Sequence, residues 1–352
     1  MEALNISFYC WLPKSGFSGG RYLSLCLANS LADSGCNVDF FTNETNSHMA
    51  LTCFENSKVN FKTISTQTSS YDFGIIIPNG PGSYDFYNLF LDNAINLNHK
   101  NIFYNFESGN WWNAQSPYKK DISLWDPWKK VAKLCDTILS ISRTGNQWAK
   151  EFYDNQDFIY EPGPININYE KPNLVKSKKV FIMSRFGATS VHKGWNQLHL
   201  LNTKVLSNFE IILNTGNVNL NQDIKNNISN LFSKNEIKVT FRHSISEKEK
   251  KQLMKESSFL FFATEFEGLG MPPLEAISLG TNVLCSDIPV LRETGEGFYV
   301  FFDNKSANID HKIEQALHKK IPFEEVVKFN NKHSMSGISN SLITKLHDRK
   351  KK

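Results

Sequence analysis

The sequence predicts two doubly wound α/β domains, each built on a parallel sheet. Its 352 residues suggest two domains, because one domain takes roughly 100–200 residues. Short apolar runs alternate with amphipathic stretches along the chain, which is the pattern of βαβ units. The segment 161–171, with Pro162, Gly163 and Pro164, interrupts this alternation and is expected to be a linker. The domains are therefore expected to span residues 1–168 and 173–330.

Five apolar runs before the linker are expected to be strands of one sheet. They are Ile6–Cys10, Asn37–Phe41, Phe73–Ile77, Asn101–Tyr104 and Thr137–Ser140. Between the first two, Tyr22–Ser34 is expected to be a helix, because its apolar residues recur at helical spacing ahead of Gly35.

Six apolar runs after the linker are expected to form the second sheet. They are Val180–Ser184, Glu210–Leu213, Lys238–Phe241, Phe259–Ala263, Asn282–Cys285 and Gly297–Phe302. Helices are expected at Glu247–Lys255 and Pro273–Leu279, and residues 331–352 should form a helical segment that packs back toward the first domain. Ligands of such sheets bind outside the carboxyl ends of the strands, so the active site is expected in a cleft between the domains.

Composition excludes several classes of protein. There are 39 Lys and Arg residues against 35 Asp and Glu, a net charge of +4, which is too small for a dedicated nucleic-acid binder. No apolar run approaches the roughly 18–20 residues that span a bilayer, and the start lacks a basic region and cleavage site, so a cytoplasmic chain is expected. The basic residues within 348–352 are expected to be solvated, with weak membrane-surface contact as the alternative. The six cysteines contain no CxxC pair and are expected to be free, buried thiols.

The most informative motif is TEFEGLGMPPLEAISLG, residues 264–280. It follows an apolar strand, and Pro272 and Pro273 favour the first turn of a helix. Glu267 on the loop and Glu275 on the helix are placed at the carboxyl end of that strand. Glycines between them allow backbone N–H groups to approach an anion. A sugar nucleotide needs such an arrangement, although Glu275 could equally complement the helix dipole while Glu267 is solvated.

Two further segments carry candidate binding residues. Arg185 follows the strand VFIMS and Lys193 lies in the loop beyond it; both side chains suit phosphate oxygens, with ordinary surface positions as the alternative. Gly19 and Gly20 lie in a loop between the first strand and the first helix, where glycine allows close approach to a ligand. That loop has neither GxGxxG nor GxxxxGK[ST] spacing, so a plain tight turn is its alternative.

The motif EGLGMPPLEAISLG, with two glutamates at E-x7-E spacing, closely resembles the signature of family 4 of the retaining glycosyltransferases, the glycosyl transferases group 1. The resemblance extends over residues 5–345 and implies the GT-B fold of two facing Rossmann-like domains. Arg185 and Lys193 resemble the diphosphate-binding pair of that family, Gly19 and Gly20 resemble its amino-terminal glycine loop, and residues 161–168 resemble its interdomain linker.

The resemblance also implies roles at the motif itself. Glu275 would bind the ribose hydroxyls of the donor, and Glu267 the hydroxyls of its sugar. Backbone groups of Gly268, Leu269 and Gly270 would contact the sugar diphosphate. The catalytic group implied is Glu267 together with the Arg185 and Lys193 cations. The residues SVH before the lysine are a departure that leaves open which side chain reaches which phosphate.

Residues 105–118, NFESGNWWNAQSPY, are expected to form an interdomain loop. Many members of the family carry a histidine there against the donor sugar, and Glu107 or Asn110 would replace it. The adjacent Trp111 and Trp112, together with these polar groups, suggest an acceptor site, because aromatic faces and amides commonly bind sugars. Core packing is the alternative for both tryptophans.

The predicted function is transfer of a sugar from a nucleoside diphosphate sugar to an acceptor hydroxyl in glycan, polysaccharide or glycoprotein-glycan synthesis, with retention and without a metal or other cofactor. The expected partners are a nucleotide-sugar donor and a glycan, lipid-linked or other hydroxyl acceptor. Two alternatives stay open: a non-catalytic sugar-nucleotide or glycan-binding protein, and an inverting enzyme of the same fold. The sequence leaves open the nucleobase (UDP, GDP or dTDP), donor sugar, acceptor, linkage and oligomeric state.

Overall fold

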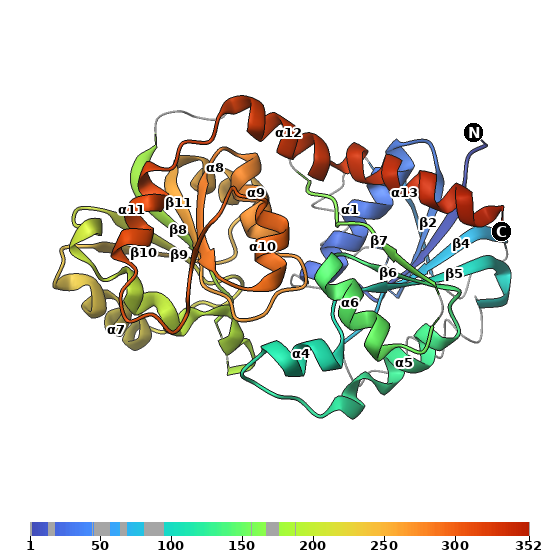
Figure 1. Ribbon diagram of the computed structural model, residues 1–352, viewed down its shortest axis with the longest axis horizontal. Helices are drawn as coiled ribbons and strands as arrows, with labels where there is room; N and C mark the ends of the chain where they lie inside the picture. Colours follow the sequence, from blue (N-terminus) through green and yellow to red (C-terminus); the bar gives the residue numbers. More distant parts are fainter. Residues whose placement is uncertain are drawn as a thin grey trace. The chain divides into compact units, whose positions relative to one another are not determined.

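The computed structural model describes residues 2–12, 18–43, 45, 57–63, 69–80, 95–155, 157–166, 176–186 and 188–351. The chain divides into two compact units (Figure 1). The first comprises Met1–Ala114, Lys119–Asn166 and Asn331–Lys352, and the second Gln115–Tyr118 and Ile167–Asn330.

The first unit contains a seven-stranded parallel sheet in the order β3-β2-β1-β4-β5-β6-β7. Its strands are β1 (Asn5–Tyr9), β2 (Asn37–Thr42), β3 (Asn60–Thr63), β4 (Tyr71–Ile76), β5 (Asn98–Asn105), β6 (Thr137–Ser140) and β7 (Phe158–Tyr160). The five predicted strands are confirmed. The sequence missed β3 and β7, which lie at the two edges of the sheet and are only four and three residues long.

The helical elements of the first unit lie between its strands, except α13, which follows the last strand of the chain. They are α1 (Gly19–Asp33), η2 (Ile95–Leu97), α4 (Gly109–Gln115), η3 (Ile122–Trp125), α5 (Asp126–Lys133), α6 (Arg143–Phe152) and α13 (Met335–Lys350). Helix α1 confirms the predicted helix, although it begins at Gly19 rather than at Tyr22.

The predicted linker is buried where the structure describes it. Residues 161–165 have no exposed member, and Ile165 forms a parallel bridge with Ser334. A Cβ on Gly163 would overlap the side chain of Leu23, so this glycine allows the backbone to pass close to α1. The proline-containing stretch up to residue 166 is therefore part of the first unit, and residues 167–171 lie outside the described ranges.

The second unit contains a six-stranded parallel sheet in the order β10-β9-β8-β11-β12-β13. Its strands are β8 (Ser177–Met183), β9 (Glu210–Asn214), β10 (Lys238–Arg242), β11 (Ser257–Phe262), β12 (Asn282–Ser286) and β13 (Val300–Phe302), so all six predicted strands are confirmed. Chain order reverses between β8 and β11. In doubly wound sheets this switch point, at the carboxyl ends of the strands, is where ligands bind.

The second sheet is packed against an apolar core and a set of helices (Figure 1). The helical elements after β8 are η4 (Ala188–Lys193), η5 (Trp195–Leu201), η6 (Lys204–Leu206), α7 (Gln222–Ser233), α8 (Glu247–Glu256), α9 (Met271–Ser278), α10 (Pro289–Gly295), α11 (Asp310–His318) and α12 (Phe323–His333). Helices α8 and α9 correspond to the two predicted there.

The basic carboxyl end corrects one prediction. Helix α13, red in Figure 1, belongs to the first unit and packs on α1, where Ser34 Oγ lies 2.6 Å from Ser339 Oγ. Three ion pairs fix its last turns: Lys345 with Glu161 at 2.6 Å, Arg349 with Asp157 at 2.7 Å and Lys350 with Asp72 at 2.8 Å. The prediction of a solvated tail is therefore wrong for Arg349 and Lys350.

The cysteines and the lengths of the helices bear on two further predictions. The cysteines in the described ranges, Cys10, Cys26, Cys36, Cys135 and Cys285, are free and buried, as predicted, while Cys53 lies outside those ranges. Among the helices of the described ranges, none has the length and apolar character required to cross a bilayer.

Candidate functional site

The glutamate-rich motif lies where β11 ends and α9 begins, in the second unit. Gly270 caps the helix with a left-handed backbone, φ 84°, and Pro272 and Pro273 occupy its first turn. A Cβ on Gly270 would lie 2.5 Å from Leu291 Cδ2. The backbone angle favours glycine there, and a larger residue would also have to displace the end of the Leu291 side chain. Pro272 and Pro273 have no backbone N–H, so Met271 is the only one of the first three residues of α9 that offers one. The helix dipole still adds positive potential beside the loop.

The structure brings Lys193 and Glu267 together. Lys193 Nζ lies 2.6 Å from Glu267 Oε1, and their side chains are 24% and 13% exposed. Thr264 Oγ1 lies 3.3 Å from the same carboxylate oxygen. The sequence placed these two residues in separate constellations, and the ion pair joins the loop after β8 to the loop after β11.

Gly194 explains how the lysine reaches this position. Its φ is 72°, and a Cβ there would coincide with the carbonyl oxygen of Ala263 at the end of β11. Two hydrogen bonds hold the same approach: Glu265 N–H donates to His192 O at 2.8 Å, and Ser184 Oγ donates to Lys193 O at 3.1 Å. The sequence signal for this contact is the glycine directly after Lys193, which our predictions did not use.

Arg185 lies just past the carboxyl end of β8, the strand paired with β11. Its side chain is exposed. Among the described residues it makes no hydrogen bond and no ion pair. The switch point of the second sheet therefore presents one unpaired guanidinium near the sheet edge where Lys193 and Glu267 are found.

Glu275 is buried rather than solvated, and it contacts a lysine that the sequence did not single out. Lys250 Nζ lies 3.0 Å from Glu275 Oε1 and 2.8 Å from Glu247 Oε2. Burial raises the pKa of Glu275, and Lys250 opposes that rise. Burial lowers the pKa of Lys250, but the two carboxylates outweigh it, so the pKa is raised and the lysine stays charged. The missed signal is helical spacing: Lys250 shares the buried face of α8 with Met254.

The remaining backbone candidates lie at helix starts. Gly268 is half-buried, and Leu269 is buried between the two glutamates of the motif. Gly19 and Gly20 form the first turn of α1, after β1 of the first sheet. A Cβ on Gly20 would lie 3.3 Å from the ring of Phe106, so packing contributes to the choice of glycine there. Residues 13–17 of the predicted loop lie outside the described ranges.

The predicted sugar-binding loop is mostly helix and core, which corrects the expectation for its tryptophans. Trp111 and Trp112 lie in α4 and are 0% and 4% exposed. The Nζ of Lys120 lies 3.6 Å from the ring centroid of Trp112, and Gly145 allows close packing against Trp111. A tryptophan with no exposed face cannot stack on a sugar, so core packing, the alternative left open, is what the structure shows.

Glu107 and Asn110 lie at the start of the same segment and are half-buried. Asn110 Oδ1 accepts hydrogen bonds from Ser108 Oγ at 2.7 Å and from Trp111 N–H at 2.8 Å. Its Nδ2 donates to Trp148 O at 3.1 Å. The amide therefore helps to start α4, and its contact with a sugar stays a prediction, as does that of Glu107.

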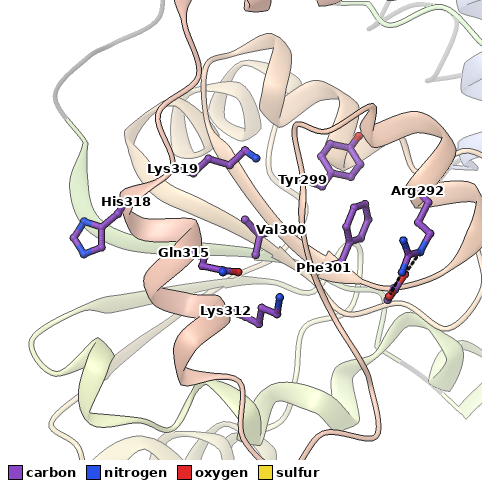
Figure 2. Close-up of a pocket in the computed structure, with 9 residues that line it drawn as sticks. Arg292, Tyr299, Val300, Phe301, Lys312, Gln315, His318 and Lys319 are labelled. Atoms are coloured by element: carbon purple, nitrogen blue, oxygen red, sulfur yellow. Dashed lines mark hydrogen bonds and ion pairs between the residues drawn. The ribbon is translucent and has the colours of Figure 1, made fainter.

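A separate hollow of about 640 Å³ lies on the outer edge of the second sheet, between β13 and α11 (Figure 2). It is lined by Asp287, Arg292, Tyr299, Val300, Phe301, Lys312, Gln315, His318 and Lys319. None of the predicted site residues is among them. Across the described ranges, no three His, Cys, Asp or Glu side chains are grouped so as to hold a metal ion.

Comparison with solved structures identifies the fold. Sucrose-phosphate synthase from Thermosynechococcus elongatus has a TM-score of 0.68 and 14% identity, with 98% of each chain covered. Anabaena HepE in complex with UDP-glucose has a TM-score of 0.71 and 14% identity, with 98% of this chain and 100% of that chain covered. With two parallel doubly wound sheets, the protein has the predicted GT-B fold.

Comparison with sequence families finds a match in the second half of the chain. Residues 166–333, just under half of the chain, match the family model of glycosyl transferases group 1. The chain is 29% identical over 212 residues to the O-antigen chain mannosyltransferase RfbU of Salmonella typhimurium, which covers 58% of this chain and 56% of that protein. The match confirms the predicted resemblance to this family over residues 166–333. The chain spans about half the length of the curated relative.

The role of Gly194 leads to a stability prediction with a matched control. Gly194→Ala should destabilise the protein well beyond Gly216→Ala. Both glycines have positive φ, 72° and 68°, but a Cβ at Gly216 meets nothing within 4 Å. Gly216→Ala should cost about 1–2 kcal/mol, the ordinary price of a left-handed residue, and Gly194→Ala should add the clash with Ala263. Urea unfolding measures both, and equal losses would contradict the proposed close approach.

Proposed function

We propose that this protein is a retaining glycosyltransferase that moves a hexose from a nucleoside diphosphate sugar to an acceptor hydroxyl. One observation carries the proposal: at the switch point of the second sheet, Lys193 is fixed on Glu267 while Arg185 is exposed at the end of the neighbouring strand. Arg185 and Lys193 therefore form a positively charged site that also contains the Glu267 carboxylate. The similar proteins support the same class, because one is a mannosyltransferase and another is in complex with UDP-glucose.

The cations of the site suit the leaving group of such a reaction. As the bond from the sugar to the diphosphate breaks, negative charge develops on the diphosphate. Positive groups that are already in place stabilise that charge without reorganising. Arg185 offers a planar fork for phosphate oxygens, while Lys193 and the N-terminus of α9 add positive potential.

Glu267 suits the sugar itself. Its Oε1 is held by Lys193 and lies near Thr264 Oγ1, so the carboxylate has one defined orientation. An ionised carboxylate is a strong acceptor for hydroxyl donors. We infer that Glu267 orients the hexose through its hydroxyls, and that the diphosphate takes up the proton of the acceptor hydroxyl, so no separate side-chain base is needed.

Transfer should not require a divalent cation, because Arg185, Lys193 and the helix N-terminus supply the positive charge that a metal would supply. The acceptor is proposed as a hydroxyl of a glycan or lipid-linked glycan, as in O-antigen synthesis by the named relative. We also propose that the protein acts in the cytoplasm and that it contacts membranes only at their surface.

Removal of Arg185 should slow transfer without unfolding the protein. Because its side chain is exposed and has no partner among the described residues, Arg185→Ala should leave the thermal midpoint nearly unchanged. Loss of one charge-stabilising donor should lower kcat by roughly 10²–10³-fold. Arg292→Ala is the matched control, because this exposed arginine lies by the outer hollow and pairs with Asp287. Steady-state rates near wild type for both variants would refute the assignment of Arg185.

Retention and metal independence can be tested in one experiment. A thermal-shift screen first selects the nucleotide sugar that stabilises the protein most. The transfer reaction is then run in excess chelator, and proton NMR of the product should show the anomeric configuration of the donor. An inverted product would indicate an inverting enzyme, and restoration of activity only by Mg²⁺ or Mn²⁺ would exclude the metal-free mechanism. Binding of the donor without transfer would indicate a sugar-nucleotide-binding protein.

A further inference from the structure

Helices α8 and α9 share a cluster of three charges, two of which are buried. Lys250 Nζ lies 3.0 Å from both carboxylate oxygens of Glu275 and 2.8 Å from Glu247 Oε2. The side chains of Lys250 and Glu275 are 5% and 7% exposed, while that of Glu247 is 35% exposed. Lys250 therefore neutralises a carboxylate that has almost no contact with water.

Stability alone gives a weak reason for this pair. Removing two charges from water is costly. A protein is often equally stable, or more stable, when apolar residues of similar volume replace a buried ion pair. Lys250 lies on the face of α8 that also buries Met254, a position where an apolar side chain would fit the helical pattern. The charge on Lys250 thus points to a requirement for an ionised Glu275.

Glu275 also keeps acceptor capacity. Its Oε2 is buried and lies 3.0 Å from Lys250 Nζ, with no other donor among the described residues. A carboxylate oxygen can accept more than one hydrogen bond, so the contact with Lys250 leaves capacity for a second donor. An oxygen of this kind at the start of α9, within the motif of the candidate site, is suited to accept from a hydroxyl of a ligand.

We propose that Lys250 is a positioning residue, which holds the Glu275 carboxylate charged and in one orientation so that it can accept hydrogen bonds from the ribose hydroxyls of the donor. The inference rests on the proposed function, because it takes the ligand to be a nucleoside diphosphate sugar. It adds to that function a residue outside the motif, on a different helix.

The charges around Glu275 give the expected pH dependence. The groups that act on it in the described ranges, Lys250, Glu247 and Lys251, all belong to α8. Burial and Glu247 raise the pKa of Glu275, whereas Lys250 and Lys251 lower it. Without Lys250, one of the two groups that lower the pKa of Glu275 is lost. The pKa is then higher, so Glu275 takes up a proton at a higher pH. A neutral carboxyl group is a weaker acceptor. Nucleotide affinity of a variant without this lysine should therefore increase as pH rises.

The test compares Lys250→Met with Lys248→Met, an exposed lysine on the same helix. Titration calorimetry with the nucleoside diphosphate of the preferred donor is run from about pH 6 to about pH 9, a range that brackets raised carboxyl pKa values. Lys250→Met should bind roughly tenfold or more weakly near neutral pH and recover toward wild type at the alkaline end. Wild type and Lys248→Met should change little over the same range.

Unchanged affinity of Lys250→Met at every pH would overturn the proposal, and so would an equal loss at every pH, which a merely displaced helix would cause. If circular dichroism shows that Lys250→Met does not fold, Lys250→Gln carries the same expectation, because it keeps a polar head and loses the charge. Failure of both variants to fold would assign the lysine to stability and reject the positioning role. Absence of binding by the wild type would instead refute the proposed function itself.

Discussion

The candidate site depends on one close approach between two stretches of backbone. At Gly194 the loop after β8 passes so near the end of β11 that only a hydrogen fits against the carbonyl of Ala263. This approach places Lys193 on Glu267, although the two residues are 74 positions apart in the chain. A cation and a carboxylate from different loops thereby become one rigid group at the switch point of the sheet. Preorganised charge of this kind is what transfer of a glycosyl group requires.

Buried charge is the second constraint on the site. Glu275 is held in a region with little water, where a carboxylate alone would take up a proton. Lys250 offsets that tendency at 3.0 Å, and Glu247 in turn helps to keep Lys250 charged. The result is a pair of carboxylates with different surroundings in one motif: Glu267 is at the edge of solvent, and Glu275 is almost enclosed. Such a difference suits two ends of one donor molecule.

Much of the fold could be predicted because parallel strands buried on both faces appear in the sequence as apolar runs. The edge strand β3, with the sequence NFKT, has no such run and was missed. At the site, the motif EGLGMPPLEAISLG, with Glu267 and Glu275 at E-x7-E spacing, was sufficient for the resemblance to the family. Lys250 could not be found in the same way, because a lysine three residues after a glutamate is usually a solvated surface pair. Trp111 is buried because of the residues that pack on it in the folded protein, and these contacts could not be predicted from the sequence.

The central claim is that the carboxyl ends of β8 and β11, with α9, bind a nucleoside diphosphate sugar. A crystal structure of the protein saturated with the nucleoside diphosphate of its preferred donor tests this claim most directly. The account predicts diphosphate oxygens within hydrogen-bond distance of Arg185 and Lys193, and ribose hydroxyls donating to Glu275. A nucleotide bound instead in the hollow between β13 and α11, or anywhere away from these three side chains, would contradict it.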